Sequence, residues 1–309
     1  MLNRKQFIQI AGGGLLSLAA PRFIEAASDS NRFHFAVIAD THIIDRFYKG
    51  PERTSEDTES LRRSAERLAR TRSAIGALRP KIEQVFLVGD FFHDYPSEDI
   101  DFYYQNATRI DHAKELIDGF SMPVHVGFGN HDYWVPKLSR EASHELFRRK
   151  LNTRPYYSVE HNGWKFIHLN NFLGATWQAG HERFNKSVGS LGEEQLNWLE
   201  AELAQLKPSF IFVHFPLMLI APTERSDYGL YPILKRHRDT IQRVISGHWH
   251  KWFEFGRSYG PQHLVIASTR YDENAFLVVS VDRKKATHEL MNLHLVDWNT
   301  HYSKPYHST

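Results

Sequence analysis

Short apolar runs alternate with longer amphipathic segments along the chain from Arg32 onward. This alternation is typical of β-sheets covered by helices, because strands bury short continuous stretches whereas helices bury one face of a longer segment. The apolar runs predict strands over 33–39, 84–88, 123–128, 164–169, 210–214 and 243–246. The amphipathic segments predict helices over 58–78, 100–118, 138–149 and 192–206.

The best-supported helix is the one predicted over 192–206. Ser190 is followed three residues later by Glu193, which is the spacing of a capping box at a helix N-terminus. Leucines then recur at helical intervals, at Leu196, Leu199, Leu203 and Leu206.

The pattern changes after residue 250, where four strand-like segments follow one another with no helix between them. They cover 252–255, 263–267, 276–281 and 288–294. We expect them to form a second sheet that closes on the first, which gives an α/β fold. The polar segments 45–59 and 176–189 are long enough to be functional loops.

Residues 1–27 have the pattern of an export signal, with basic Arg4 and Lys5, an apolar run over 8–20 and small residues near 26–28. The segment 3–9 resembles a twin-arginine signal with lysine in the second basic position. The alternative is a retained amphipathic helix, which the glycines at 12–14 disfavour. We therefore expect an exported protein, periplasmic or secreted, whose mature part, 28–309, is one domain without a membrane span.

Composition narrows the possible chemistry. The absence of cysteine excludes disulfides, zinc fingers, iron–sulfur clusters and thiolate catalysis. The formal charge is +2, and removal of residues 1–27 makes it zero, so no bulk nucleic-acid binding is expected. The 19 histidines direct attention to metal sites built from nitrogen and oxygen.

Metal-capable side chains follow five of the predicted strands at the point where each strand ends. In open α/β sheets this edge carries the functional site. The residues are Asp40 and His42, then Asp90, then Asn130 to Asp132, then His214, then His248 and His250.

Two interpretations of this pattern are open. A lone histidine such as His214 is more often a core residue than a ligand, so the strand ends could hold unrelated turn and capping residues. Taken together, however, so many polar groups at one buried edge would be costly without a cation. The combination therefore favours a metal centre.

These residues resemble the calcineurin-like metallophosphoesterases, whose motifs occur here in order as Asp40-x-His42, Gly89-Asp90, Gly129-Asn130-His131-Asp132, His214 and Gly247-His248-x-His250. The resemblance covers roughly residues 33–255, and the segment 192–199 is similar to one found in bacterial diesterase and phosphatase branches. It implies a four-layer α/β/β/α sandwich with two mixed sheets flanked by helices.

The resemblance also implies a centre of two divalent metal ions. One ion would be held by Asp40, His42, Asp90 and His250. The second would be held by Asp90, Asn130, His214 and His248, which makes Asp90 the bridging ligand. Nitrogen and oxygen ligands are compatible with Mn, Fe, Zn, Ni or Co. The nucleophile would be a metal-bound hydroxide.

His131 is the implied catalytic residue, which protonates the leaving group or stabilises the transition state. The alternative is that it only forms structural hydrogen bonds. Several branches of the family carry an aspartate where this chain has His93. The residue that orients His131 is then His93 or Asp94, or both have only a supporting role beside the site.

Aromatic residues border the motifs at Trp134 and Trp249. They are candidates for substrate contact, with plain packing as the alternative. We expect a small phosphoester substrate and, first, a small-molecule or cyclic-nucleotide phosphodiesterase. The alternatives are a broad-specificity phosphomonoesterase and a metal-binding protein without turnover.

Overall fold

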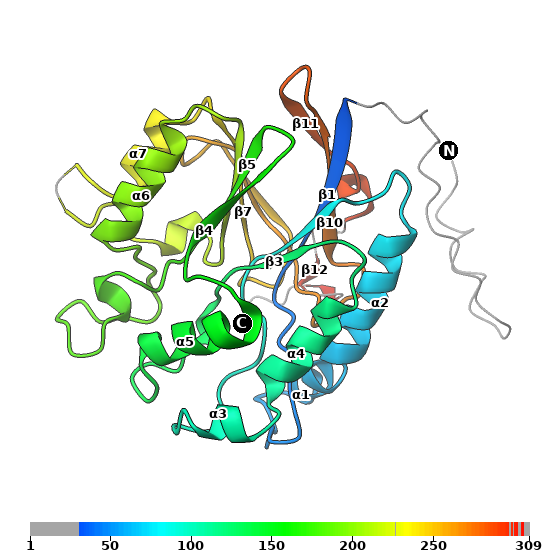
Figure 1. Ribbon diagram of the computed structural model, residues 1–309, viewed down its shortest axis with the longest axis vertical. Helices are drawn as coiled ribbons and strands as arrows, with labels where there is room; N and C mark the ends of the chain where they lie inside the picture. The colour runs from blue at the N-terminus through cyan, green and yellow to red at the C-terminus, as the bar shows by residue number, and fades with distance from the viewer. Residues whose placement is uncertain (1–30, 226, 297, 299, 302–303, 306–309) are drawn as a thin grey trace, which may run out of the picture.

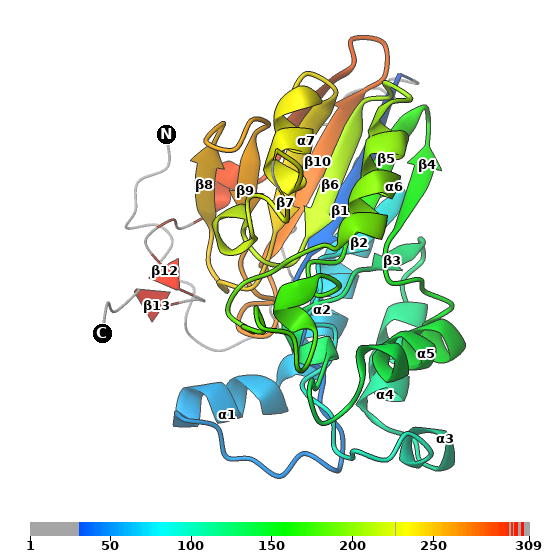
Figure 2. The same ribbon diagram turned by 90° about the vertical axis from the view of Figure 1, so that its left-hand side faces the viewer.

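The computed structural model describes residues 31–225, 227–296, 298, 300–301 and 304–305. It confirms an α/β fold in which two mixed sheets pack face to face between outer helices (Figures 1 and 2). The predicted export signal, residues 1–27, lies outside the described residues. Among the helices that are described, none combines the length and apolar character needed to cross a bilayer.

The first sheet has the order β11-β10-β1-β2-β3. Its parallel part is formed by β1 (Arg32–Ile38), β2 (Gln84–Leu87) and β3 (Val124–Val126). Antiparallel strands β10 (Phe276–Asp282) and β11 (Thr287–Leu290) extend it on the other side of β1.

The second sheet has the order β4-β5-β6-β7-β9-β8. Strands β5 (Trp164–Leu169), β6 (Ser209–Val213), β7 (Ile241–Ser246) and β9 (His263–Val265) are parallel. The edges are β4 (Tyr157–His161) and β8 (Phe253–Gly256). A separate two-residue pair joins β12 (Thr300–His301) to β13 (Lys304–Pro305).

The strands after residue 250 do not form a sheet of their own, so that expectation was wrong. β8 and β9 complete the second sheet, whereas β10 returns to pair with β1 along its full length, from Arg32↔Asp282 to Ile38↔Phe276. Strand patterns give the faces of a strand but not its partner, because backbone pairing is the same for any neighbour.

Helices α1 (Ser55–Arg62), α2 (Ser64–Ala77), α3 (Phe102–Gln105), α4 (Arg109–Asp118) and α5 (Arg140–Leu151) follow strands of the first sheet. Figure 1 shows α2 and α4 over its outer side, and α6 (Glu193–Leu203) and α7 (Leu230–Arg236) over the second sheet. The helices predicted over 58–78 and 100–118 are each divided in two.

The capping box predicted for α6 is absent. The helix begins after Gly192, whose φ of 81° suits glycine, and the Ser190 hydroxyl instead lies 2.6 Å from the Thr176 hydroxyl. The leucine pattern is correct for Leu196, Leu199 and Leu203, which are buried. Leu206 lies beyond the helix end and is 72% exposed.

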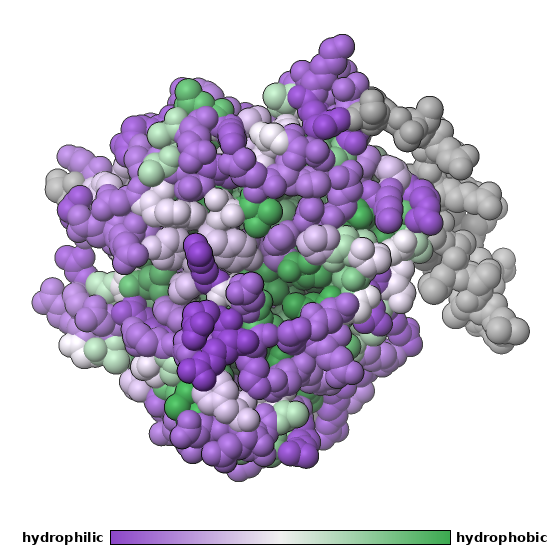
Figure 3. Space-filling model, in the orientation of Figure 1, coloured by the Kyte–Doolittle hydropathy of each residue, from purple (hydrophilic) through white to green (hydrophobic). Residues whose placement is uncertain are grey.

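Aromatic side chains fill the space between the two sheets. The Phe86 ring stacks on Phe166 and on Phe212, with ring centroids 4.6 Å apart in each pair. Such a core fixes the separation and relative orientation of the sheets. The aromatic layer therefore holds the strand ends of both sheets at a common edge. The outer surface is mostly hydrophilic on the face shown in Figure 3.

Candidate metal centre

The structure brings the predicted strand-end residues together at one edge of the sandwich. Asp40 and His42 follow β1, and Asp90 follows β2. Asn130 begins a single 3₁₀ turn, Asn130–Asp132, after β3. His214 follows β6 in the other sheet, and β7 leads to His248 and His250. Both sheets contribute because their parallel strands end at this edge.

A first group of donors consists of Asp40, His42, Asp90 and His250, with one ligand atom from each lying within 4.8 Å of the others. The Nε2 atom of His42 lies 3.4 Å from Asp90 Oδ2 and 3.2 Å from His250 Nε2. The Nε2 atom of His250 lies 3.3 Å from Asp40 Oδ1. Four nitrogen and oxygen donors thus point at one small volume.

A second group consists of Asp90, His214 and His248, again within 4.8 Å of one another. The Nε2 atom of His214 lies 3.2 Å from Asp90 Oδ2 and 3.1 Å from Asn130 Oδ1. Asp90 therefore belongs to both groups, and the amide oxygen of Asn130 adjoins the second.

The donor chemistry fits a pair of cations. The Nδ1 atom of His214 lies 2.9 Å from the carbonyl oxygen of Val88, which can only accept a hydrogen bond. In the neutral ring this leaves Nε2 unprotonated and directed at Asp90. Asp40 and Asp90 are almost completely buried, and buried carboxylates are stable only with positive charge nearby.

The backbone at this edge has an unusual conformation. Asp40, His42, Asp90, His248 and His250 all have positive φ, between 46° and 70°. Such conformations cost on the order of 1–3 kcal/mol each for non-glycine residues, and they cluster at functional sites. The fold therefore places these five side chains at the expense of local backbone stability.

Two glycines allow the loops to approach each other closely. A Cβ atom at Gly129 would lie 2.1 Å from the Asp90 backbone nitrogen, and one at Gly247 would lie 2.5 Å from Asp40 Oδ2. Any larger residue would displace the carboxylates. These glycines therefore explain the Gly-Asn and Gly-His steps of the sequence pattern.

Asp132 ties two of the loops together. Its buried carboxylate accepts hydrogen bonds from the backbone nitrogens of Phe91 at 3.1 Å, Phe92 at 3.3 Å and Gly129 at 2.7 Å. The loop after β2 is thereby fixed to the loop after β3. The sequence motif contains Asp132, but its role is visible only in the structure.

His131 is oriented by Asp94. The Nδ1 atom of His131 lies 2.6 Å from Asp94 Oδ1, and its backbone nitrogen donates to Asp90 Oδ1 at 2.8 Å. Although burial opposes it, the negative charges of Asp90 and Asp94 raise the pKa of His131 to about 9. The His93 ring stacks on His131 with centroids 4.8 Å apart. Of the two residues considered from the sequence, Asp94 makes the hydrogen bond and His93 the stacking contact.

Charge complementarity also acts on the carboxylate shared by both groups. Burial favours its neutral form, but His214, His131 and His42 hold the pKa of Asp90 well below its usual range. Burial also favours the neutral form of His214 and so lowers its pKa, yet the negative charges of Asp90 and Asp40 raise that pKa to about 9. The site is therefore built to keep Asp90 ionised and to interact with positive charge.

Trp134 and Trp249 are both half-buried near the site. The Lys137 ammonium lies 4.7 Å from the Trp134 ring centroid. The Trp249 ring contacts Phe253, with centroids 5.6 Å apart. Both interpretations of these rings, substrate contact and packing, therefore stay predictions.

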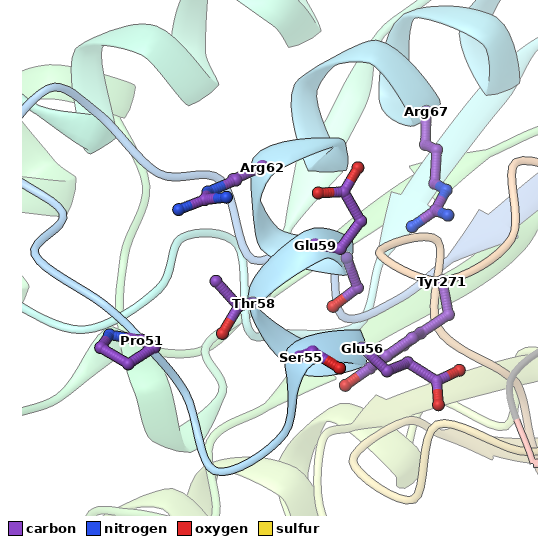
Figure 4. A pocket seen from close by; sticks show the side chains of 9 residues that line it. Pro51, Ser55, Glu56, Thr58, Glu59, Arg62, Arg67 and Tyr271 are labelled. Atoms are coloured by element: carbon purple, nitrogen blue, oxygen red, sulfur yellow. The ribbon is translucent and has the colours of Figure 1, made fainter.

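A cavity of about 660 Å³ lies beside α1 (Figure 4). It is lined by Pro51, Ser55, Glu56, Thr58, Glu59, Ser60, Arg62, Arg67 and Tyr271. The Tyr271 ring connects this cavity to the donor groups, because its centroid lies 5.4 Å from that of His250. The predicted loop 45–59 thus ends in α1, which borders this cavity. The sequence pattern gave no signal for Tyr271.

Comparisons with known proteins agree with this geometry. The family model for calcineurin-like phosphoesterases matches residues 33–252. A dimetal phosphatase from Danio rerio has a similar structure, with a TM-score of 0.54 and 19% identity, over 84% of this chain and 98% of that chain.

A purple acid phosphatase from yellow lupin (Lupinus luteus) gives a TM-score of 0.47 and 12% identity, over 85% of this chain and 53% of that chain. No curated protein matches by sequence. The family model covers well over half of the chain and every residue of both donor groups. The chain therefore belongs to the calcineurin-like phosphoesterase family.

Proposed function

We propose that the protein is a two-metal phosphoesterase that hydrolyses small phosphodiesters or phosphomonoesters with water. The observation that carries this proposal is the position of Asp90, whose carboxylate belongs to both donor groups. A carboxylate has two oxygens and can bridge two cations, whereas an amide of the same shape lacks the charge. A site built for one cation has no need of the second group.

Asp40, His42, Asp90 and His250 would hold one divalent ion, and Asp90, Asn130, His214 and His248 the other. When bound, such ions make hydroxide available near neutral pH and neutralise phosphate oxygens. The donor set is compatible with Mn, Fe, Zn, Ni or Co. The protein supplies the fixed geometry, which the aromatic core and the left-handed backbone positions impose.

His131 is the proposed catalytic residue. Asp94 accepts the hydrogen bond from Nδ1–H, so the ring orientation is fixed and Nε2 is left to act on the substrate. The negative charge of Asp94 favours the protonated ring, as proton donation to a leaving oxygen requires. We expect His131→Ala to retain metal and to slow hydrolysis by about 10²–10⁴-fold.

Our first choice of substrate is a small-molecule or cyclic-nucleotide phosphodiester, with broad phosphomonoesters as the alternative. The near-zero charge without residues 1–27 supports a small substrate over a nucleic acid. The cavity beside α1 offers room for the organic part of such a molecule.

The test is hydrolysis of bis-p-nitrophenyl phosphate and p-nitrophenyl phosphate by manganese-loaded protein, followed by a screen of cyclic nucleotides, glycerophosphodiesters and nucleotide monoesters. Faster hydrolysis of the diester supports the first choice, and faster hydrolysis of the monoester supports the alternative. If metal-replete protein turns over neither compound nor any member of the screen, a binding role without catalysis replaces the proposal.

We also propose that residues 1–27 direct export and are removed, which leaves 28–309 as the mature domain. The support is the basic, apolar and small-residue pattern of this segment. N-terminal sequencing of the protein recovered from the periplasm or medium of a bacterial host tests this. An intact N-terminus in the cytoplasm contradicts it.

A further inference from the structure

The first observation concerns the two nitrogens of His42, which face different partners. Nε2 is directed at Asp90 and His250 in the first donor group, at 3.4 and 3.2 Å. Nδ1 lies 3.2 Å from the Nδ1 atom of His93. His42 is completely buried, so its ring hydrogen bonds are made with the protein. Whether Nε2 can bind a cation depends on which nitrogen carries the proton.

His93 links His42 to a carboxylate. Its Nε2 atom lies 3.4 Å from Glu52 Oε1 and 3.7 Å from Asp94 Oδ2. Glu52 is the nearer of the two carboxylates, and Asp94 already makes a short hydrogen bond with His131. We therefore take Glu52 as the partner of His93. The order of groups leading away from the metal centre is therefore His42, His93 and Glu52.

The Glu52 carboxylate influences which nitrogen of each ring carries the proton. An ionised carboxylate only accepts, so it favours a proton on His93 Nε2. The neutral His93 ring then has an unprotonated Nδ1, which accepts from His42 Nδ1–H. This favours the form of His42 that has its lone pair on Nε2, directed into the first donor group. Asp90 Oδ2, 3.4 Å from that nitrogen, has the opposite preference when no cation is bound, because it too can only accept. Each step follows from the number of protons on a neutral imidazole.

Glu52 is itself held in position. Its Oε1 atom accepts a hydrogen bond from the Tyr48 hydroxyl at 3.0 Å, and its backbone nitrogen donates to the Thr58 hydroxyl at 2.8 Å. Thr58 is buried in α1. The carboxylate therefore comes from the polar segment that α1 anchors, and its place depends on that element.

We infer that Glu52 and His93 are positioning residues that fix the tautomer of His42 and so strengthen cation binding at the first donor group. This inference rests on the proposed two-metal function for its biological meaning. Outer partners of metal-binding histidines typically change metal affinity by about 10–100-fold when they are removed. Here the outer partner is a histidine that passes on the preference of a carboxylate.

Two variants separate this role from simple packing. His93→Phe keeps a flat ring to stack on His131 but removes the hydrogen bond to His42 and the contact with Glu52. Glu52→Gln keeps the size of the side chain, but its amide can donate as well as accept, so it no longer dictates the tautomer. The matched control is Glu83→Gln, because Glu83 pairs with His161 at 2.8 Å in a carboxylate–histidine contact that involves none of the proposed ligands.

The experiment measures two properties other than turnover. Long-range ¹H–¹⁵N spectra of the metal-free protein at neutral pH report the His42 tautomer, and manganese titration reports the affinity of each site. We expect the fraction of His42 that carries its proton on Nδ1 to be the same in the unmodified protein and in Glu83→Gln, and to be lower in Glu52→Gln. We expect one of the two sites to bind manganese about 10–100-fold more weakly in His93→Phe.

The opposite results would overturn the inference. They are an unchanged tautomer population of His42 in Glu52→Gln, or unchanged manganese affinity in His93→Phe. If His93→Phe does not fold, Glu52→Gln decides through the tautomer alone. A protein that hydrolyses no phosphoester but shows the expected tautomers and affinities contradicts the proposed function and leaves this inference standing.

Discussion

Asp90 combines burial, negative charge and contact with both donor groups. Its replacement by asparagine preserves the shape and the hydrogen bond from the His131 backbone but removes the charge that two cations would share. We expect Asp90→Asn to bind less than two equivalents of manganese and to lose about 10³-fold or more in kcat/KM, which corresponds to several kcal/mol. Metal analysis and kinetics check this. Full activity in Asp90→Asn excludes a bridging role.

Asp94 controls the protonation of His131, which gives a prediction for pH dependence. The pKa of His131 is raised to about 9 despite burial, by Asp90 and by Asp94. A proton donor loses activity as the pH rises through its pKa. Asp94→Asn removes one of the two negative charges, so the pKa falls and the alkaline loss of activity should begin at lower pH. The pH–rate profiles of both proteins check this, and an unshifted or upward-shifted alkaline limb contradicts it.

The residues at strand ends could be identified from the sequence because two simple features coincide there. Each follows an apolar run, and parallel strands bring such positions to one edge. Glu52 and Tyr271 could not be identified, because they reach the site through the packing of α1 and of the loop before β10. Tyr271 hydrogen bonds to Asp57 in α1, a contact that no local pattern encodes.

At the scale of elements, the division of the predicted helix 58–78 shows what periodicity leaves out. The apolar face expected along it exists, since Leu61, Leu68 and Ile75 are buried. The break at Arg63 instead accompanies contacts with a distant loop. Arg270 donates to the Ser60 hydroxyl at 2.7 Å in α1, and the next helix starts at Ser64. Side-chain spacing is nearly the same for one helix or two, so only tertiary contacts distinguish them.

Short and edge elements were missed for related reasons. β4 pairs only with β5 and is mostly half-buried, so its apolar pattern is weak. The helix α7 is seven residues long and contains Pro232, which its first turn tolerates because a proline there costs no helical hydrogen bond. β4 is stabilised by its pairing with β5, and α7 by the burial of Leu230, Ile233 and Leu234.

A helix cap allows a prediction at this scale. The Ser139 hydroxyl accepts a hydrogen bond from the Ala142 backbone nitrogen at 3.1 Å and so caps α5. We expect Ser139→Ala to lower the free energy of unfolding by about 1 kcal/mol, because a backbone donor loses its partner. Hydrolysis should be unchanged, since α5 carries none of the proposed ligands. Chemical denaturation measures the first effect, and an unchanged midpoint excludes the capping role.

For the whole molecule, the relation between the two sheets is what makes the site. β1, β2 and β3 carry Asp40, His42, Asp90 and Asn130, whereas β6 and β7 carry His214, His248 and His250. The aromatic layer between the sheets, such as the Phe35–Phe210 contact at 4.9 Å, joins the two halves. The sequence pattern predicted the strand-end residues of both sheets. Only the strand pairing shows to which sheet each strand after residue 250 belongs.

Histidines buried away from the metal centre give the molecule a predictable response to acid. His263 is fully buried, and burial together with Arg243 lowers its pKa to about 3. The ring becomes protonated on unfolding below its ordinary pKa of 6.5, so the unfolded state binds the extra proton between about pH 6.5 and pH 3. The free energy of unfolding therefore falls as the pH is lowered through this window, by up to about 1.4 kcal/mol per pH unit for this one group.

In His263→Asn this contribution is absent. The decrease in the free energy of unfolding between pH 6 and pH 5 should then be smaller by up to about 1.4 kcal/mol, whatever the variant loses in total stability. Urea denaturation of both metal-free proteins at the two pH values checks the difference, and equal slopes mean that His263 is as easily protonated in the folded protein as in the unfolded chain.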